Sequence, residues 1–293
     1  MEENLLKAVS RTFYLSMKWL PPAMRPAVSL AYLLARATDS VADTSVALAA
    51  ERLAVLRSMG EAVAGSGALP AELADSMAEA QQNPAERCLL QRFGECLEML
   101  QALPEEERCL VRRVLAVIVE GQCWDLTYFD TRTCVESDDE TRRYTYRVAG
   151  CVGEFWTDLG YATMGADFCD LTPERRELMR RAGVRYGQGL QLVNILRDVQ
   201  EDAARGRSYL CSDAEVWLNR AERYLQDGVD YSTRLGSFRL RFASMLPAVL
   251  GLATLRQLRL PEKAQRRVKI SRRSVYACML ITALRCLKKT ISA

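Results

Sequence analysis

Apolar residues recur at intervals of three and four positions along almost the whole chain, and no convincing run alternates apolar with polar residues. The first pattern is typical of amphipathic helices, whereas a period of two is typical of half-buried strands. The sequence therefore predicts an all-α fold. The expected helices cover residues 3–19, 22–47, 49–64, 84–102, 105–130, 137–165, 172–204, 212–235, 238–258 and 271–289.

Proline marks the ends of several expected helices. Pro21 and Pro22 end the first helix and open the second, because proline is tolerated in a first turn but not in a helix interior. Pro104 and Pro173 each open a helix with glutamate in its first turn, which the helix dipole favours. No linker rich in Pro, Gly or Ser divides the chain, so residues 1–293 are expected to form a single domain.

The composition is that of an ordinary globular protein and excludes several kinds of chemistry. Hydrophobic residues make up 49% and charged residues 26% of the 293 positions. The chain has no histidine, which excludes a Ser-His-Asp triad, a Cys-His pair and histidine-ligated metals. Acid–base work must fall to Asp, Glu, Tyr, Lys, Cys or a substrate oxygen. The net charge of +3 is too small to indicate nucleic-acid binding.

The cysteines and the first residues indicate a cytoplasmic location. The ten cysteines are scattered without a CxxC motif, and several fall within apolar helical pattern, where free cysteine behaves as a small hydrophobe. A disulfide framework is therefore not expected. The opening sequence MEENLLKAVSRTF is acidic and lacks the apolar region of a secretory signal, so we expect a reducing cytosol.

Two aspartate pairs with the same spacing stand far apart in the chain, Asp39 with Asp43 and Asp198 with Asp202. On a helix this spacing places both carboxylates on one face, where their repulsion costs about 0.2–0.5 kcal/mol per pair. Mg²⁺ would compensate the repulsion, since it prefers one or two carboxylates together with water and phosphate oxygens. The pairs therefore favour an enzyme that handles a diphosphate. The alternatives are a solvated face for the first pair and an ion-paired surface helix for the second.

Arginines accompany both pairs. Arg36 precedes Asp39 by three residues, and Arg197 comes directly before Asp198. A guanidinium can donate forked hydrogen bonds to a phosphate, or it can form an ordinary salt bridge with its neighbouring aspartate. Both interpretations fit the sequence.

Four segments resemble motifs of the squalene/phytoene synthase family, the head-to-head prenyl-diphosphate synthases. Residues 194–210, NILRDVQEDAARGRSYL, are similar to its second aspartate-rich motif. Residues 32–43, YLLARATDSVAD, resemble the first, although Ser40 stands where an adjacent aspartate is common. Residues 10–13, SRTF, look like the N-terminal substrate-site signature, and residues 144–153, YTYRVAGCVG, look like the family's Tyr-x-x-x-Val-Ala-Gly-x-Val-Gly helix. The resemblance covers almost the whole chain.

The resemblance implies an isoprenoid-synthase-type helical bundle around a central apolar cavity, with Tyr144 assisting diphosphate departure or proton removal. It implies Mg²⁺ ligands at Asp39, Asp43, Asn194, Asp198 and Asp202. It implies diphosphate contacts from Ser10, Arg11, Arg36, Gln191, Asn194, Arg197 and Arg207. It implies a prenyl-chain pocket with Phe13, Ala149, Gly150, Gly153 and Leu192.

Spacing and residue type bear on these assignments. Residues 191, 194, 198 and 202 advance by three and four positions, so they form one stripe on a helix. Glycine within a helix costs up to about 1 kcal/mol relative to alanine. Gly150 and Gly153 therefore indicate close helix packing, a thin cavity wall, or both. Apart from the resemblance, Tyr144 could be an ordinary helix tyrosine with its hydroxyl in water.

The activity that the resemblance implies is Mg²⁺-dependent condensation of two farnesyl diphosphates, through presqualene diphosphate, to squalene, with NADPH as reductant. The general likeness is to squalene synthases of bacterial type. The enzymatic alternatives are phytoene, dehydrosqualene and hydroxysqualene synthases. A further alternative is a catalytically silent relative acting as an assembly protein, because the segment between Leu210 and Trp217 is shorter than is usual in the family.

The C-terminal segment is strongly basic. Residues 256–289 contain eleven Lys and Arg residues and a single acid, Glu262. This pattern fits either a solvated basic face or an interfacial patch for anionic lipid at the cytoplasmic face of a membrane. A membrane span is not expected, because the most apolar stretch, Val275 to Leu284, is about half the length that a span requires.

Overall fold

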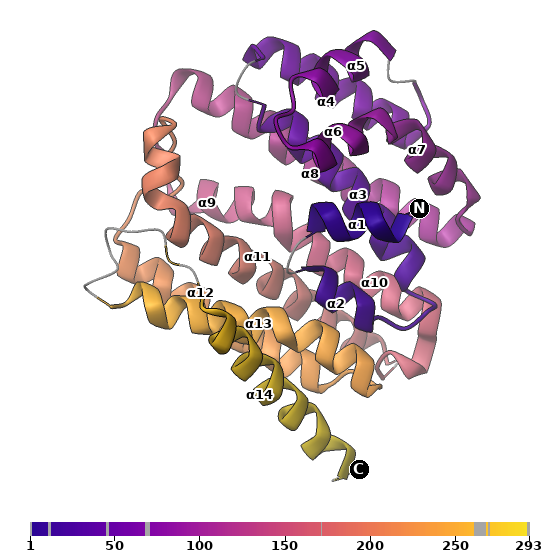
Figure 1. Ribbon diagram of the computed structural model, residues 1–293. Helices are drawn as coiled ribbons and strands as arrows, with labels where there is room; N and C mark the ends of the chain where they lie inside the picture. The colour runs from indigo at the N-terminus through magenta and orange to yellow at the C-terminus, as the bar shows by residue number, and fades with distance from the viewer. Residues whose placement is uncertain are drawn as a thin grey trace. The chain divides into compact units, whose positions relative to one another are not determined.

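The computed structural model describes residues 2–10, 13–44, 47–67, 71–170, 172–260, 268 and 270–291. It leaves out the side chains of residues 2–4, 13, 15, 71–74 and 288–291. The fold is all-α, as predicted, and within the described ranges there is no strand (Figure 1). An isolated bridge joins Cys134 and Ser208.

The chain divides into two compact units. The first comprises Met1–Met17 and Pro22–Thr131, and the second comprises Lys18–Pro21 and Arg132–Ala293. The helices of the first unit are α1 (Glu2–Ser10), α3 (Arg25–Ala42), α4 (Ala49–Ala64), α5 (Ala71–Glu79), α6 (Pro84–Gln91), α7 (Phe93–Ala102) and α8 (Glu105–Thr131). The helix α2 (Phe13–Trp19) begins in the first unit and ends in the second. The elements of the second unit are α9 (Asp138–Thr145), η1 (Tyr146–Gly150), α10 (Cys151–Met164), η2 (Gly165–Asp167), α11 (Pro173–Ala204), α12 (Ala214–Thr233), α13 (Phe238–Leu258) and α14 (Arg272–Ile291).

In the first unit, α3 and α4 pack against the long helix α8. The apolar face of α3 is buried almost completely, with Leu33 and Leu34 at no more than 1% exposure. Leu56 and Met59 of α4 are fully buried as well. This packing fixes the axis of α3, and therefore the position of the polar residues at its C-terminal end.

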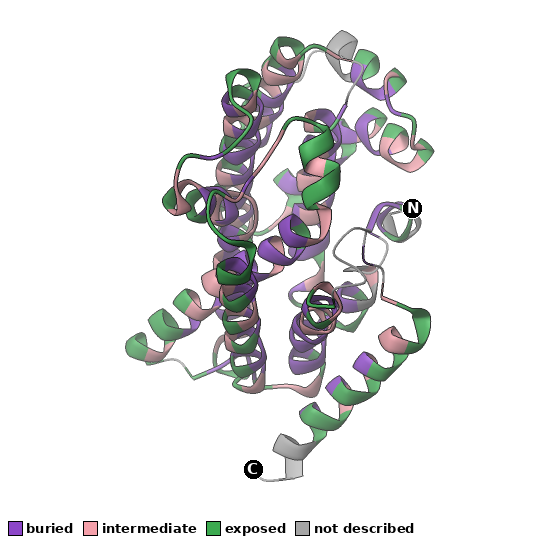
Figure 2. Cartoon of the chain, turned by 90° about the vertical axis from the view of Figure 1, so that its left-hand side faces the viewer, coloured by how far each residue is buried: buried purple, intermediate pink, exposed green. Residues whose placement is uncertain are grey.

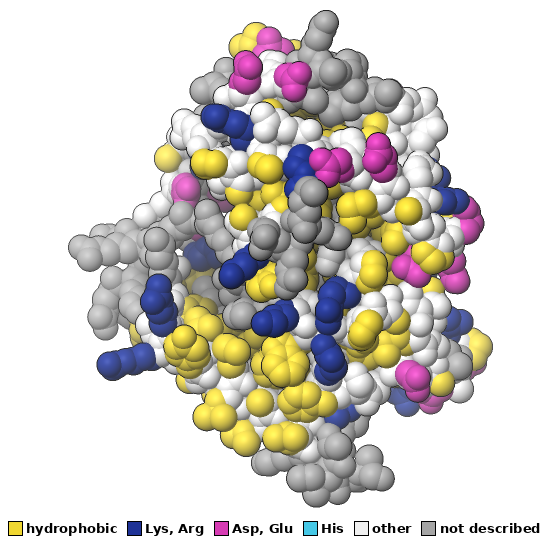
Figure 3. Space-filling view, turned by 45° about the vertical axis from the view of Figure 1, so that its right-hand side comes forward, with side chains coloured by type: hydrophobic (Ala, Val, Ile, Leu, Met, Phe, Trp, Pro, Cys, Tyr) yellow, Lys and Arg dark blue, Asp and Glu magenta, His cyan; other side chains and the backbone are white. Residues whose placement is uncertain are grey.

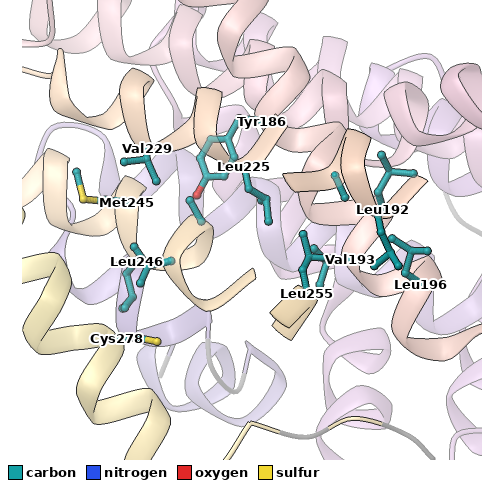
Figure 4. Packing of buried hydrophobic residues seen from close by; sticks show 14 of the residues in the cluster. Tyr186, Leu192, Val193, Leu196, Leu225, Val229, Met245, Leu246, Leu255 and Cys278 are labelled. Atoms are coloured by element: carbon teal, nitrogen blue, oxygen red, sulfur yellow. The ribbon is translucent and has the colours of Figure 1, made fainter. Parts of the chain in front are cut away.

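In the second unit, α11 packs against α10 and α12, and α13 packs against α12 and α14. Figure 4 shows part of the resulting apolar cluster, with side chains from all four of the helices α11 to α14. Its largest member is Trp217, which is fully buried. Among the described helices, α13 alone is long and apolar enough to cross a membrane. However, 67% of its apolar stretch is buried inside the protein, which is typical of a core helix.

The short segment Lys18–Pro21 belongs to the second unit because Trp19 packs on α13. The Trp19 ring lies 6.4 Å from the Phe238 ring and 5.1 Å from the Phe242 ring, measured between centroids. Arg239 also donates a hydrogen bond to the Trp19 carbonyl oxygen at 3.2 Å.

The helix expected over residues 137–165 is divided into three parts. A turn of π-helix, η1, separates α9 from α10, and such turns are frequent at functional sites. The glycines beside it lie directly against α11. A Cβ added to Gly153 would lie 1.9 Å from the carbonyl oxygen of Gly183, and one added to Gly187 would lie 2.2 Å from that of Ala149. The backbones of α10 and α11 therefore touch, so close helix packing accounts for Gly153.

Other helix boundaries also differ from the expectation. The helix expected over residues 84–102 breaks at Arg92, whose φ of −104° and ψ of 16° depart from helical values. The helix α5 was not expected at all. The helix expected over 22–47 begins at Arg25 and ends at Ala42. Residues 45 and 46 of that range lie outside the described residues.

We predict that Gly153→Ala lowers the free energy of unfolding by about 3 kcal/mol, because the new methyl group overlaps the Gly183 carbonyl. Chemical denaturation monitored by circular dichroism measures this. The control is Gly94→Ala, since a Cβ there meets nothing within 4 Å. The control should be as stable as the parent protein or more stable by up to about 1 kcal/mol. Equal effects of the two substitutions would contradict the packing argument.

Candidate functional site

The first aspartate pair lies at the C-terminal end of α3. Asp39 is in the last turn, and Asp43 is the C-cap residue, whose backbone N–H donates to the Asp39 carbonyl oxygen at 2.9 Å. The end of a helix carries a partial negative charge, so two carboxylates here are unfavourable, and the last turn of α3 contains no basic residue. A cation bound to the pair would relieve both repulsions.

The pKa of Asp39 reflects this crowding. The pKa of Asp39 is raised to about 7, chiefly by burial of its carboxyl group and also by the charges of Asp43 and Glu86, while Arg36 works in the opposite direction. The Asp39 side chain still retains 44% of its exposure. The raised pKa means that the Asp39 carboxyl group ionises less readily when no cation is bound. The group is nevertheless accessible to a cation from solvent.

Arg36 is held in an ion-pair network across α3 and α6. It pairs with Asp39 and, through Nη2, with Oε1 of Glu86 at 2.6 Å. Asn83 Nδ2 donates to the same Glu86 oxygen at 2.9 Å. Burial tends to lower the pKa of Arg36, but Asp39 and Glu86 raise it above its ordinary value, so the guanidinium stays charged. The Arg36 Nε atom is buried and has no hydrogen-bond partner among the described residues.

The second aspartate pair lies in the last two turns of α11, which again has no basic residue in its last turn. The helix stops at a Schellman motif. Gly206, at a φ of +74°, donates from its N–H to the Ala203 carbonyl at 3.0 Å, and Arg207 donates to the Asp202 carbonyl at 2.9 Å. Glycine is favoured at this left-handed position because it has no Cβ. The sequence NILRDVQEDAARGRSYL thus contains its own helix stop.

Arg197 forms a two-pronged ion pair with Asp198, with Nε to Oδ1 at 2.9 Å and Nη2 to Oδ2 at 2.5 Å. These hydrogen bonds are the main reason that the pKa of Arg197 is raised. Both Arg36 and Arg197 therefore form the salt bridge with an adjacent aspartate that the sequence left open as an alternative. A diphosphate would have to displace those carboxylates to use the same donors.

The predicted stripe on α11 has its first two members in contact. Asn194 Nδ2 lies 3.4 Å from Gln191 Oε1, with Asn194 exposed and Gln191 half-buried. Asp198 follows one turn later, with its side chain 19% exposed. These amide and carboxylate oxygens are the hard donors that Mg²⁺ prefers.

Tyr144 is buried at the end of α9 and stacks on Tyr209, with ring centroids 4.7 Å apart and an interplanar angle of 14°. The segment after α11 carries Tyr209 to this place. Thr141 Oγ1 donates to the Tyr209 carbonyl at 2.7 Å, and Val135 N–H donates to the Ser208 carbonyl at 3.0 Å. The tyrosine motif and the second aspartate motif are therefore joined within one unit.

Tyr146 occupies a different environment. Its hydroxyl donates to Glu154 Oε2 at 2.8 Å, and burial, followed by that hydrogen bond, raises the pKa of Tyr146 to about 12. The Tyr146 hydroxyl is therefore committed to a structural contact and is a poor proton carrier near neutral pH. Tyr144 remains the tyrosine candidate for acid–base work.

The predicted pocket residues are found in helix contacts. Gly150 and Gly153 face α11, and a Cβ on Gly150 would lie 3.0 Å from the Gln188 side chain. Leu192 is 1% exposed within the apolar cluster of the second unit. The Phe13 side chain is outside the described residues. A pocket role for Ala149 and these residues stays a prediction.

The predicted diphosphate contacts near the N-terminus are described only in part. Ser10 is buried, and its hydroxyl donates to the Leu6 carbonyl. Arg11 lies outside the described residues. Arg207 is half-buried just after α11. The contacts that the structure gives for Ser10 and Arg207 do not place either residue at a phosphate-binding loop.

Two residues that the sequence did not single out belong to these clusters. Glu86 binds Arg36 from α6, and nothing in the sequence pattern indicates that pairing. Tyr209 was within the quoted second motif, so its aromatic ring was the available signal. Among the described residues, no group of three or more His, Cys, Asp and Glu side chains could hold a metal. Each aspartate pair thus offers two carboxylates, which fits the way Mg²⁺ completes its octahedron with water and phosphate.

Comparison with known proteins gives a consistent picture. Residues 6–217 match the model of the family described as Squalene/phytoene synthase. The chain is 30% identical to a phytoene synthase from Arthrospira platensis over 224 residues, which cover 75% of this chain and 62% of that one. It is 25% identical to a squalene synthase from Schizosaccharomyces pombe over 296 aligned positions, covering 91% of this chain and 61% of that one. The chain thus spans less than two thirds of the length of these relatives.

Solved structures share the fold. A ligand complex of TcSQS superposes with a TM-score of 0.77 at 23% identity, covering 98% of this chain and 87% of that one. A dehydrosqualene synthase in complex with a ligand superposes with a TM-score of 0.66 at 19% identity, covering 98% and 95%. At these identities the likeness establishes the fold alone.

We predict that Asp39→Asn stabilises the metal-free protein at pH 8 but not at pH 5. The folded protein holds a proton on Asp39 up to a pKa of about 7, whereas an unfolded aspartate releases it near pH 4. The free energy of unfolding of the parent protein therefore falls as the pH rises through this window, and asparagine removes that loss. Because the side chain is partly exposed, the gain at pH 8 should be only about 1 kcal/mol.

Urea unfolding with a metal chelator, at both pH values, measures this difference. The control is Asp75→Asn, an exposed acid of α5 in the same unit, which should give no gain with pH. An Asp39→Asn protein that is less stable than the parent at pH 8 would contradict the electrostatic account.

Proposed function

Because the chain belongs to the squalene/phytoene synthase family, we propose that it condenses two molecules of farnesyl diphosphate head to head, through presqualene diphosphate, to squalene. Head-to-head isoprenoid condensation is the chemistry of the family, and enzymes of this kind are prenyltransferases. The observation that carries the proposal is that all four aspartates are present, each pair at the C-terminal end of a helix without a basic residue in its last turn. That arrangement calls for bound cations.

The two aspartate pairs would hold Mg²⁺, which would supply positive charge to stabilise the diphosphate as it leaves. Asp39 and Asp43 on α3, and Asp198 and Asp202 with Asn194 on α11, would hold it. Arg36 and Arg197 would turn from their aspartates to the diphosphate as cations take over the carboxylates. Both guanidinium groups are charged and half-buried beside the aspartates, so they are available to donate to a diphosphate once the carboxylates are taken over.

Proton removal is assigned to Tyr144. In the first half-reaction, one farnesyl diphosphate loses its diphosphate, the C2–C3 double bond of the second attacks the allylic carbon, and a proton leaves as the cyclopropane closes. The Tyr144 hydroxyl would pass that proton to the departed diphosphate, which is the strongest base that the reaction itself produces. The stacking of Tyr209 on Tyr144 supports this role, because it holds the phenol ring in a fixed position.

The identity of the product is the finer part of the proposal. Squalene requires a hydride, so NADPH is proposed as the reductant. The described residues contain no strand followed by a glycine-rich turn of the Rossmann type, so no residue is assigned to NADPH and no step is derived through it. Phytoene and dehydrosqualene require no such reduction, and relatives of both the phytoene and squalene type match this chain.

The non-enzymatic alternative is a catalytically silent relative that acts as an assembly protein. The short connection between α11 and α12 favours this alternative. That connection is well anchored: Ser212 Oγ donates to Asp138 at 2.9 Å and accepts from Trp217 Nε1 at 2.8 Å. A short but ordered segment supports a working enzyme better than a degenerate one.

The ten free cysteines support the proposed location in a reducing cytoplasm.

The product assay is an incubation of the purified protein with Mg²⁺ and either farnesyl or geranylgeranyl diphosphate, with and without NADPH. We predict that the protein forms a C30 hydrocarbon from farnesyl diphosphate and no product from geranylgeranyl diphosphate. The central bond of the C30 product should be saturated only when NADPH is present. Mass spectrometry identifies the hydrocarbon. A C40 product from geranylgeranyl diphosphate would replace squalene by phytoene, and no turnover with either substrate would favour the silent relative.

We predict that Asp43→Asn and Asp198→Asn each reduce diphosphate release by about 10²–10³-fold, because each removes a charged ligand for the cation that stabilises the leaving group. A diphosphate-release assay, in which added pyrophosphatase converts the product to phosphate for detection, measures turnover, and circular dichroism checks that the helical fold is intact. The control is Glu177→Gln, an exposed acid in the first turns of α11, which should keep parental turnover. Near-normal turnover in both aspartate variants would rule out the metal assignment.

A further inference from the structure

The helix α14 is apolar on two opposite sides, and only one of them is covered by the protein. Its inner side packs on α13, with Cys278, Thr282 and Cys286 at no more than 5% exposure. Met279 and Ala283 join the same apolar cluster. This inner side is sufficient to explain why α14 docks on the second unit.

The outer side carries a stripe of large apolar residues that face solvent. Figure 2 shows the exposed residues of this helix in green. The stripe consists of Tyr276, Leu280, Leu284 and Leu287, which are 68%, 62%, 54% and 47% exposed. Their positions advance by four, four and three residues, so the side chains form one line along the helix. Ile281 borders the stripe and is 44% exposed.

Single exposed apolar residues are common on protein surfaces, but a continuous stripe is typical of a surface that binds something. The stripe also stands out within this protein. The other exposed large apolar residues of the second unit, such as Leu178 on α11 and Val216 on α12, are isolated in the sequence. In Figure 3, apolar side chains gather in the lower part of the view, with Lys and Arg side chains along their upper border.

The charge around the stripe identifies the kind of partner. Residues 263–293 contain no Asp or Glu, and the exposed residues Arg272, Arg273 and Arg285 lie on α14 itself. The sequence adds further basic residues on both sides of the helix: Lys263, Arg266, Arg267, Lys269, Lys288 and Lys289. An apolar line within a basic field is complementary to a lipid bilayer that carries anionic headgroups, which offers acyl chains and negative charge at the same depth.

A second copy of the chain is a poorer partner for this face. Paired by two-fold symmetry, two such faces would bring the same arginines together, and like charges across an interface are repulsive. A nucleic acid would use the basic residues but would leave the apolar stripe in water. A bilayer satisfies both features at once.

We propose that the outer face of α14, defined by Tyr276, Leu280, Leu284 and Leu287 with Arg272 and Arg273, binds the surface of an anionic membrane. The helix lies in the plane of the headgroups, with the apolar stripe inserted among the acyl chains and the arginines at the phosphates. The inference is independent of the product and does not require turnover.

The test is co-sedimentation of the full chain with vesicles of phosphatidylcholine alone or of phosphatidylcholine mixed with phosphatidylglycerol. The protein should sediment with the mixed vesicles, and binding should weaken as salt is raised, because the ionic part is screened. Leu280→Gln/Leu284→Gln should reduce the vesicle partition coefficient by about tenfold or more through lost apolar insertion. Arg272→Gln/Arg273→Gln should reduce it by about tenfold on the mixed vesicles only.

The matched control is Leu178→Gln/Val216→Gln, which replaces two apolar residues of similar exposure, 54% and 47%, elsewhere in the second unit. It should bind vesicles like the parent protein, and thermal unfolding confirms that every variant is folded. Failure of the parent protein to bind mixed vesicles would overturn the proposal, as would equal binding by the Leu280→Gln/Leu284→Gln variant. Sedimentation velocity provides the remaining test, because a parental dimer that this variant dissociates would identify a second copy as the partner instead.

Discussion

Negative charge gathered at the C-terminal ends of two helices is the constraint on which this protein depends. At the end of α3, Asp39 and Glu86 both bind the guanidinium of Arg36, and the charge of Asp43 acts on Asp39, so that the three carboxylates outnumber the guanidinium. The helix dipole adds partial negative charge at the same place. The consequence is visible in Asp39, whose pKa rises to about 7 although an arginine is bound to it. An arrangement that is unfavourable in the metal-free protein becomes favourable when divalent cations bind, and this is the property expected of a site for a metal–diphosphate complex.

The packing of the second unit positions Tyr144 and the second aspartate pair. The backbone contact between Gly153 and Gly183 brings α10 against α11, and the π-helical turn η1 connects α10 to α9, which carries Tyr144. After the Schellman motif at Gly206, the chain returns to α9, where Tyr209 stacks on Tyr144. The close packing at Gly153, the helix stop at Gly206 and the stacked Tyr209 ring therefore act together. They couple the position of Tyr144 to that of the second aspartate pair. A carboxylate or a phenol placed on a flexible loop would lack this pre-organisation.

Much of the fold could be predicted because its signals are local. The helices α4, α8, α11 and α13 begin and end within a few residues of their expected bounds, since proline or glycine punctuates them. The four aspartates could be found because helix geometry turns a spacing of four into a shared face. Glu86 could not, because its contact with Arg36 depends on how α6 packs in the first unit. The break at Arg92 and the π-helical turn η1 could not be predicted either. Both depend on packing, which the helix propensities of single residues do not reflect.

We propose that the aspartate pairs bind diphosphate through Mg²⁺, and calorimetric titration tests this claim most directly. Inorganic diphosphate is titrated, with Mg²⁺ present or absent, into the parent protein, Asp43→Asn and Asp202→Asn. We predict tight binding that requires Mg²⁺ and a large loss of affinity in each single variant, because each substitution removes a charged ligand for the cation. Parental affinity in either single variant, or binding that is indifferent to Mg²⁺, would contradict it.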